Sequence, residues 1–405
     1  MTVYRKIAFR QLRAKHSFGF ISFTSILSII GLLLGVAFLI MISAFSNGFS
    51  SAIEDKLSSL DGHLRIQKYN GYELVDENDL SYLDSLLHSN LEFASMTPYI
   101  EKRVMVRKGN ATEGLMIYGI EQNSLQTIFG LEKFIIEGKT TFTNPNSIII
   151  GNELAKQLEV NIDDKLVLFD IEKLISENLV IANNYIVSGI IKTGFPEYDK
   201  LLAFVSFEGI DLLFGNTKKY DGVISNFTKP EQIAKVDEVI ANNLDFPFST
   251  TTWKERHANL FEWLNIYDIP ILLLMVFIII VAVFNISATL WMIVVEKSKN
   301  IGILLTMGFN QMEIRKIFLL EGLIIGGIGS LFGLFFAILV LFFQAKYHFI
   351  SLSSDIYFMD YLPVKMSLKS LIMYPVFAIL LTLIASSIPS FRASKVEPAE
   401  AVRYE

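Results

Sequence analysis

Four long segments of the chain contain no charged side chain: residues 17–53, 269–295, 322–345 and 370–391. Each is at least 22 residues long, and about 20 apolar residues in a helix cross the hydrocarbon core of a bilayer. The pattern therefore predicts four transmembrane helices. The stretch between the first two segments mixes charged and apolar positions as a folded domain does, so the chain is neither purely soluble nor mostly embedded in membrane.

Basic residues set the expected orientation, because loops rich in Lys and Arg stay in the cytoplasm. Residues 1–16 are basic and hold no acid, which places the N-terminus inside and residues 48–266 outside. That outer region has 20 Lys and Arg against 32 Asp and Glu. Four spans return the C-terminus to the inside, where the loop 296–316 and the tail 391–405 carry more Lys and Arg than the outer loop 346–367.

The predicted fold class is an α-helical membrane protein with four transmembrane helices and a large α+β extracytoplasmic domain between the first and second helices. The N-terminal segment has an apolar and a basic side, which favours an amphipathic helix on the inner leaflet over a flexible basic flank. The expected divisions are 1–16 for this helix, 17–47, 267–295, 317–345 and 368–390 for the spans, 48–266 for the outer domain, 296–316 for a cytoplasmic loop, 346–367 for an outer loop and 391–405 for the tail.

Period-2 and period-3.6 segments interleave in the outer domain, which predicts a mixed α and β unit. Two alternating runs, 101–107 and 114–120, flank a Lys-Gly-Asn turn and predict a β-hairpin. The other expected elements are strands at 147–150, 165–169, 185–191 and 202–207 and helices at 152–158 and 230–242.

Composition excludes several classes of site. Charged residues are 19% of the chain, there is no cysteine, and the five histidines lack ligand spacing. No phosphate-binding glycine loop is present, and a net charge of −6 argues against a nucleic-acid partner. We therefore expect no catalytic, cofactor-binding or metal site in this chain.

The third span has two pairs of glycines at four-residue spacing, Gly322 with Gly326 and Gly329 with Gly333. Such pairs let helix backbones approach closely. They predict packing inside the chain's own bundle, with a subunit seam as the alternative. Glu321 lies about one turn beyond Lys316, and we expect its charge to be paired or to reach the inner interface rather than to form an ion pathway.

The cytoplasmic loop holds an apolar run, Ile301–Met307, followed by Gly308, which can end a helix. A short apolar helix between two spans needs a surface that buries it. The residues leave two surfaces open, a groove on a soluble partner or the membrane itself. The face formed by Ile301, Leu304 and Leu305 is the one expected to be buried.

The chain resembles the type VII ABC transporter permeases, the superfamily that includes MacB, FtsX and LolC/LolE. The resemblance rests on the coupling and terminal motifs Glu296–Asn310, Ile314–Phe318, Glu321–Gly326, Pro389–Lys395 and Glu397–Glu405, and on Ser28–Gly35 and Ser46–Phe49 near the start. Shorter phrases follow in the outer domain, at Pro98–Ile100, Tyr118–Ile120, Ile150–Ala155 and Gly189–Gly194. Length, the absence of a fused ATPase and the terminal Arg-Tyr-Glu favour the lipoprotein-releasing branch.

The resemblance implies a permease subunit, not an enzyme, in the inner membrane of a two-membrane bacterium. It implies two copies of a separate ATPase that bind ATP and Mg²⁺, a second permease copy or paralogue, a lipoprotein substrate and a periplasmic carrier. The residues expected to couple to the ATPase are Ile301, Leu304, Leu305, Met307 and Gly308. The loop 170–184 is the nearest candidate for a hairpin that captures the carrier.

The resemblance also implies an apolar cavity for the lipoprotein's acyl chains between the first two spans. Apolar, partly flexible side chains suit such a ligand, although the same residues suit lipid contact or bundle packing. The expected lining is Phe38, Met41, Ile42, Phe45, Leu274, Met275 and Ile278. Two other functions remain open: a MacB-like export or FtsX-like cell-wall-enzyme partner, and a membrane-anchored binding protein without an ATPase.

Overall fold

The structure is a computed structural model that describes residues 19–69, 74–215, 219–353, 357 and 359–395. The predicted N-terminal helix at 1–16 and most of the predicted tail lie outside the described residues. The chain forms two compact units. The helical unit comprises residues up to 51, 263–351 and 361 onward, and the sheet unit comprises 52–262 and 352–360.

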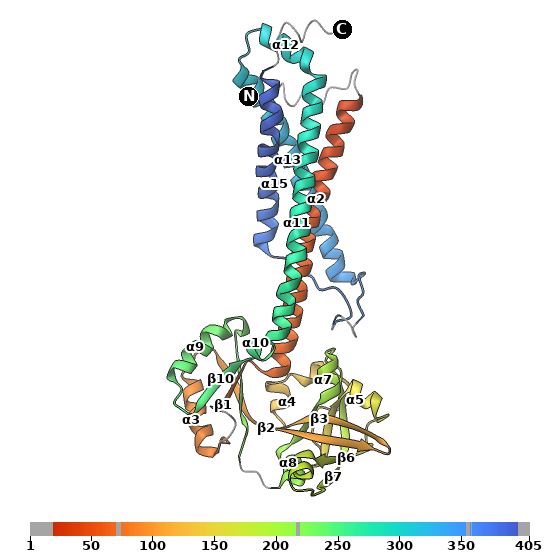
Figure 1. The fold of residues 1–405 in the computed structure, drawn as a ribbon, viewed down its shortest axis with the longest axis vertical. Coiled ribbons are helices and arrows are strands. Elements are labelled where there is room, and N and C mark those ends of the chain that lie inside the picture. The colour runs from red at the N-terminus through yellow and green to blue at the C-terminus, as the bar shows by residue number, and fades with distance from the viewer. Residues whose placement is uncertain (1–18, 70–73, 216–218, 354–356, 358, 396–405) are drawn as a thin grey trace. The chain divides into compact units, whose positions relative to one another are not determined.

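In the described residues, five helices run through the helical unit and extend beyond it, and Figure 1 labels them. Their bounds are α2 Gly19–Asp61, α11 Ala258–Glu296, α12 Ser298–Thr306, α13 Gln311–Tyr347 and α15 Leu368–Ala393. All except α12 are long and apolar enough to cross a membrane. Helices α2 and α11 extend beyond their uncharged segments. The last ten residues of α2 and the first residues of α11 belong to the sheet unit.

The helical unit packs around side chains from all five helices. Leu32 and Val36 of α2, Leu290 of α11 and Phe318 of α13 are among its buried members. Ile301 of α12 belongs to the same core and is 2% exposed. The short helix is thus part of the bundle and not a free loop.

The described part of the sheet unit contains a ten-stranded sheet in the order β10-β1-β9-β2-β3-β8-β5-β7-β4, and β6 pairs with both β2 and β7. The strands are β1 Leu64–Lys68, β2 Phe93–Lys108, β3 Ala111–Ile120, β4 Ile135–Gly138, β5 Ser147–Gly151, β6 Lys165–Asp170, β7 Ala182–Ile191, β8 Leu202–Ser206, β9 Gly222–Phe227 and β10 Phe248–Thr252. Most pairs are antiparallel, whereas β3 with β8 and β5 with β7 are parallel.

The expected hairpin is present, because β2 and β3 pair from Ile100↔Gly119 to Lys108↔Ala111. Its two-residue turn includes Gly109 at φ 58°, a left-handed backbone that glycine adopts without steric cost. The strands expected at 147–150, 165–169, 185–191 and 202–207 are β5, β6, β7 and β8.

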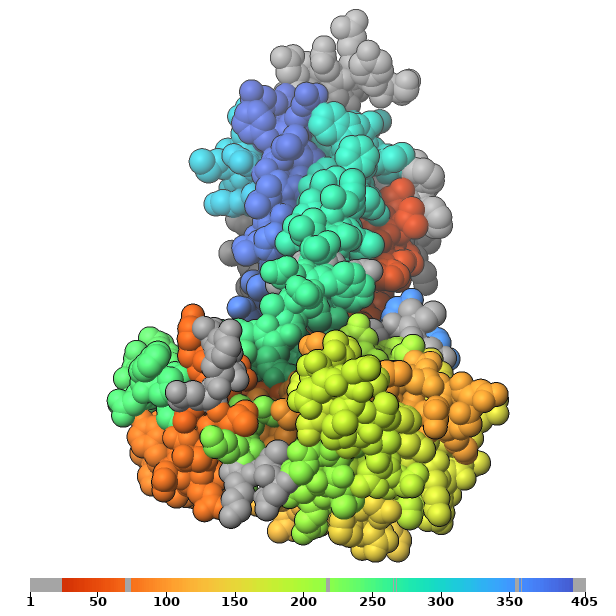
Figure 2. Space-filling view, turned by 60° about the horizontal axis from the view of Figure 1, so that its bottom comes forward, coloured from red at the N-terminus to blue at the C-terminus, as the bar shows by residue number. Residues whose placement is uncertain are grey.

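Short helices connect the strands of the sheet unit. The described ones are α3 Glu77–His88, α4 Ser124–Thr127, η2 Leu131–Lys133, α5 Asn152–Gln157, α6 Ile171–Ser176, α7 Pro196–Leu201, α8 Phe207–Phe214, η3 Pro230–Gln232, α9 Ile233–Asn243 and α10 Trp253–Arg256. In the space-filling view the green residues of α9 lie beside the orange residues of α3, and the two helices are in contact (Figure 2).

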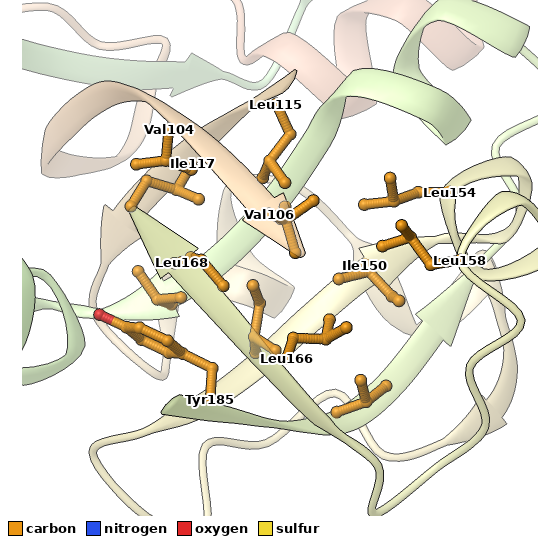
Figure 3. Close-up of a cluster of buried hydrophobic side chains, with 14 of the residues drawn as sticks. Val104, Val106, Leu115, Ile117, Ile150, Leu154, Leu158, Leu166, Leu168 and Tyr185 are labelled. Atoms are coloured by element: carbon orange, nitrogen blue, oxygen red, sulfur yellow. The ribbon is translucent and has the colours of Figure 1, made fainter. Parts of the chain in front are cut away.

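The core of the sheet unit lies between β2, β3, β5, β6, β7 and β8 (Figure 3). Alternate residues of each strand point inward, as the period-2 pattern requires. The labelled side chains that meet there are Val104, Val106, Leu115, Ile117, Ile150, Leu154, Leu158, Leu166, Leu168 and Tyr185.

A buried ion-pair cluster joins the end of α2 to the sheet. Arg65 of β1 is paired with Asp61, the last residue of α2, and its Nη1 lies 3.1 Å from both Glu101 Oε2 and Tyr118 Oη. The other oxygen of Asp61 lies 2.7 Å from Arg256 Nε, just before α11. Within the sheet unit, this cluster therefore links the last residue of α2 and the segment just before α11 to β1.

Candidate substrate groove and coupling helix

An apolar groove runs between α2 and α11 inside the helical unit. Its volume is about 710 Å³. The lining residues are Gly31, Leu34, Gly35, Phe38, Ile269, Pro270, Leu273, Leu274, Phe277, Ile278, Val281, Ala282 and Asn285. Asn285 is the one member of this lining with a polar side chain. A groove of this composition accepts an elongated hydrocarbon better than any polar ligand.

Small residues on α2 make room for the groove. A Cβ at Gly31 would come within 2.5 Å of Asn285 Nδ2, and one at Gly35 would lie 3.6 Å from Ile278 Cγ2. Ser28 donates a hydrogen bond of 3.0 Å to Asn285 Oδ1. This hydrogen bond links the two helices next to the groove. The glycines have no side chain, so they leave the space of the groove unfilled on the α2 side.

The predicted acyl-cavity residues fall into two groups in the structure. Phe38, Leu274 and Ile278 line the groove. Met41 and Phe45 are half-buried and pack against the core of the helical unit. The remaining two predicted residues, Ile42 and Met275, are partly buried and are not part of the lining, and Tyr374 Oη lies 4.0 Å from Met275 Sδ.

Several groove residues were missed by sequence reasoning. The pair Gly31 and Gly35 has the same four-residue spacing that singled out the glycines of the third span, so this signal was available. Phe277 and Val281 gave no such signal, because the second span is apolar on every side.

Helix α12, which was predicted to couple to an ATPase, turns the predicted face inward. Ile301 is buried, and Leu304 and Leu305 pack against the core of the helical unit. The opposite side presents two large apolar residues to the outside, Ile303 at 44% and Met307 at 73% exposure. Gly308, with φ 98°, ends the helix in a left-handed conformation. Any soluble partner of this helix would thus meet Ile303 and Met307 and not the predicted face.

The four packing glycines lie on two sides of α13. A Cβ at Gly322 or Gly326 would collide with Ser386 or Thr382 of α15. A Cβ at Gly329 would lie 2.9 Å from Leu32 Cδ2 of α2, and one at Gly333 would lie 2.7 Å from Leu33 O. These contacts are all within the chain's own bundle, and they let α13 touch α15 with one pair and α2 with the other.

No group of three or more His, Asp and Glu side chains in the described residues is placed to hold a metal. Glu321, expected near the inner interface, is fully buried and lies 3.9 Å from Lys297. The loop proposed for carrier capture contains the short helix α6 before β7 begins at Ala182.

Comparison with known proteins places these features in a family. Residues 25–242 match the MacB-like periplasmic core domain, and residues 272–398 match the FtsX-like permease C-terminal domain. The chain is 28% identical over 414 residues to the lipoprotein-releasing system transmembrane protein LolC of Xylella fastidiosa, and equally to LolC of Neisseria meningitidis serogroup B, with 98% of each chain covered. It is 25% identical to LolE of Haemophilus influenzae over 97% of both chains.

The chain belongs to the MacB-like periplasmic core domain family. Within that family it is a LolC/LolE-type permease, because the similarity to both proteins extends over nearly the whole chain and includes the FtsX-like part. It is a multi-pass membrane protein with four candidate spans in its described residues, and the core-domain match begins inside the first span and ends before the second. The expected family, function class and general layout are confirmed, whereas the residue-level assignments rest on the geometry above.

Proposed function

We propose that this chain is the transmembrane permease subunit of an ATP-driven complex in the inner membrane that releases lipoproteins to a periplasmic carrier. The observation that carries the proposal is the apolar groove between α2 and α11, in a chain similar over its length to lipoprotein-releasing proteins. The groove supplies what such a substrate needs, a hydrocarbon-like surface that reaches into the membrane-spanning part of the chain.

The acyl chains of the lipoprotein occupy the groove in this proposal. Transfer of an acyl chain from lipid to water costs about 0.8 kcal/mol per methylene. A groove as apolar as lipid removes that cost for the first step, because the chains move from one hydrocarbon environment to another. Work is then needed only to expel them toward the carrier.

That work comes from a separate ATPase, present in two copies, that binds ATP and Mg²⁺ and docks on α12. A second permease, either another copy or a paralogue, completes the complex. The exposed apolar residues of α12 support the docking, since Ile303 and Met307 lie one turn apart on the side that faces away from the bundle. Burial of each side chain contributes roughly 1.5–3 kcal/mol before the costs of association.

The docking proposal predicts that Met307→Glu weakens capture of the ATPase by at least tenfold, because its carboxylate must be desolvated in the interface. Met312→Glu in the first turn of α13 is the matched control, since Met312 is 71% exposed and Met307 is 73% exposed. The measurement is copurification of the ATPase with the full-length chain in detergent. Equal capture by both variants would show that α12 is not the docking element.

The function itself is tested by reconstitution of the chain and its copurified ATPase in proteoliposomes with a triacylated lipoprotein. ATP-dependent transfer of the lipoprotein to a soluble carrier is the expected result. A MacB-like or FtsX-like mechanotransmission role is the second candidate, because both family domains are present. Copurification of an export partner or a cell-wall enzyme, with no lipoprotein released, would favour that role instead.

A further inference from the structure

Glu321 of α13 is a buried carboxylate whose role the groove and the docking face leave unexplained. The residue is 0% exposed, and neither carboxylate oxygen accepts a hydrogen bond from the described residues. Lys297 Nζ lies 3.9 Å from Oε1, beyond hydrogen-bond reach. An ionisable side chain held inside a transmembrane bundle is costly, and such residues serve a function more often than they serve stability.

Lys297 places the opposite charge at the start of the coupling helix. Its backbone N–H donates to Ile293 O of α11 at 3.0 Å, and its carbonyl accepts from Ile301 N of α12 at 2.9 Å. The ion-paired side chain is 9% exposed. Lys297 therefore connects α11 to α12, and a shift of α12 relative to α13 would change the distance from its ammonium group to Glu321. Glu296, the preceding residue, contributes a second carboxylate that interacts electrostatically with this ammonium group.

Glu321 stands at the start of the section of α13 that touches both groove-forming helices. A Cβ at Gly322 would lie 3.5 Å from Leu290 Cδ1 of α11. Further along, Gly329 and Gly333 bring α13 against Leu32 and Val36 of α2. A close-packed core transmits such displacements because it has few voids to absorb them. A displacement of α13 at Glu321 would thus be transmitted to α2 and α11, the two helices that form the groove.

Stability alone does not account for the pair. Replacement of a buried ion pair by apolar groups of similar volume is often neutral or stabilising, whereas a loose pair with unfilled acceptor positions stabilises less than a hydrogen-bonded one. We propose that Lys297 and Glu321 are a positioning pair that couples movement of α12 to α13. The pair shortens into a hydrogen-bonded contact when the ATPase presses on α12, and lengthens when it releases.

This inference rests on the proposed docking of an ATPase on α12, and the experiment separates the two. Full-length chain is copurified with its ATPase and placed in nanodiscs. The variants are Glu321→Gln, Lys297→Met and the charge reversal Lys297→Glu with Glu321→Lys. Lys299→Met, an exposed lysine two residues along, is the matched control. ATPase capture, thermal stability and lipoprotein-stimulated ATP hydrolysis are measured for each.

If the pair has this role, every variant captures the ATPase normally. Lipoprotein stimulation of ATP hydrolysis falls at least fivefold in Glu321→Gln and in Lys297→Met. The charge reversal restores at least half of the stimulation, and Lys299→Met behaves as the parent. Single variants that keep full stimulation would overturn the inference, as would a charge reversal no better than Glu321→Gln or a loss of stimulation that tracks a fall in thermal stability. Absence of ATPase capture in the parent chain would instead refute the proposed function.

Discussion

The groove is best tested by placing a charge on one side of α11 and then on the other. Leu274 lines the groove, whereas Leu272 is 64% exposed and is not part of the lining. Two residues along a helix differ by about 200° in direction, so these neighbours point to opposite sides at almost the same depth. Leu274→Asp and Leu272→Asp therefore carry similar costs of membrane insertion, and only the first puts a carboxylate in the groove.

The expected effect follows from the acyl chain that the carboxylate displaces. A hydrated carboxylate keeps roughly four methylenes away from the wall, which costs about 3 kcal/mol at about 0.8 kcal/mol each. This corresponds to occupancy weakened roughly 100-fold, since about 1.4 kcal/mol is a factor of ten. We expect Leu274→Asp to lower lipoprotein release by at least 30-fold at subsaturating substrate and Leu272→Asp by less than threefold.

The assay is transfer of a fluorescent triacylated lipoprotein from proteoliposomes to a soluble carrier, with ATPase capture measured on the same preparations. Capture should be normal in both variants, which shows that the bundle has assembled. Similar release rates for the two variants, whether both normal or both slow, would refute the assignment of this groove to the acyl chains.

Three further predictions concern the stability of the chain in detergent. Gly326→Ala should destabilise it by about 1–3 kcal/mol, because the new Cβ would lie 2.9 Å from Thr382 Cβ, whereas Gly327→Ala, with open space around it, should be neutral or slightly stabilising. Burial lowers the pKa of His63 to about 4, below its ordinary 6.5. Between these two values the unfolded chain binds a proton that the folded chain does not, so the free energy of unfolding falls as the pH drops below 6.5, by roughly 2 kcal/mol at pH 5. His63→Asn should reduce this pH dependence in thermal unfolding. Arg65→Met should cost about 3–5 kcal/mol and speed proteolysis of the sheet unit, because it removes the cation from one oxygen of the buried Asp61 carboxylate and leaves Arg256 beside the other oxygen; equal protease resistance would contradict this role for the cluster.

The sequence predicted those helices and strands whose signal lies within a short stretch of the chain. The hairpin of β2 and β3 follows from alternation around a turn that contains Gly109, and the helices follow from uncharged length. The strands β1 and β10 were not predicted. They are short, and they pair with each other across nearly the whole outer domain, so no local window contains the contact that makes them strands.

Sequence could identify an amphipathic helix at α12 but not which surface would bury its apolar side. The predicted face of Ile301 and Leu304 is real, and the bundle itself covers it. The same ambiguity affected the groove, because Phe38 and Phe45 are seven residues apart on one helix and equally apolar, yet one lines the groove and the other packs inward. Burial inside a membrane protein is set by neighbouring helices, and hydropathy does not report them.

In the proposed function, α13 carries force to the groove, because it contacts both helices that form the groove walls. A groove as apolar as the bilayer lets acyl chains enter at little cost, so the energy must be applied to the walls that expel them. Those walls are α2 and α11, and α13 contacts the first through Gly329 and Gly333 and the second beside Gly322. A substitution that loosens these contacts should therefore slow lipoprotein release more than ATP hydrolysis. The displacement of α13 would then no longer be transmitted to the two helices that form the groove.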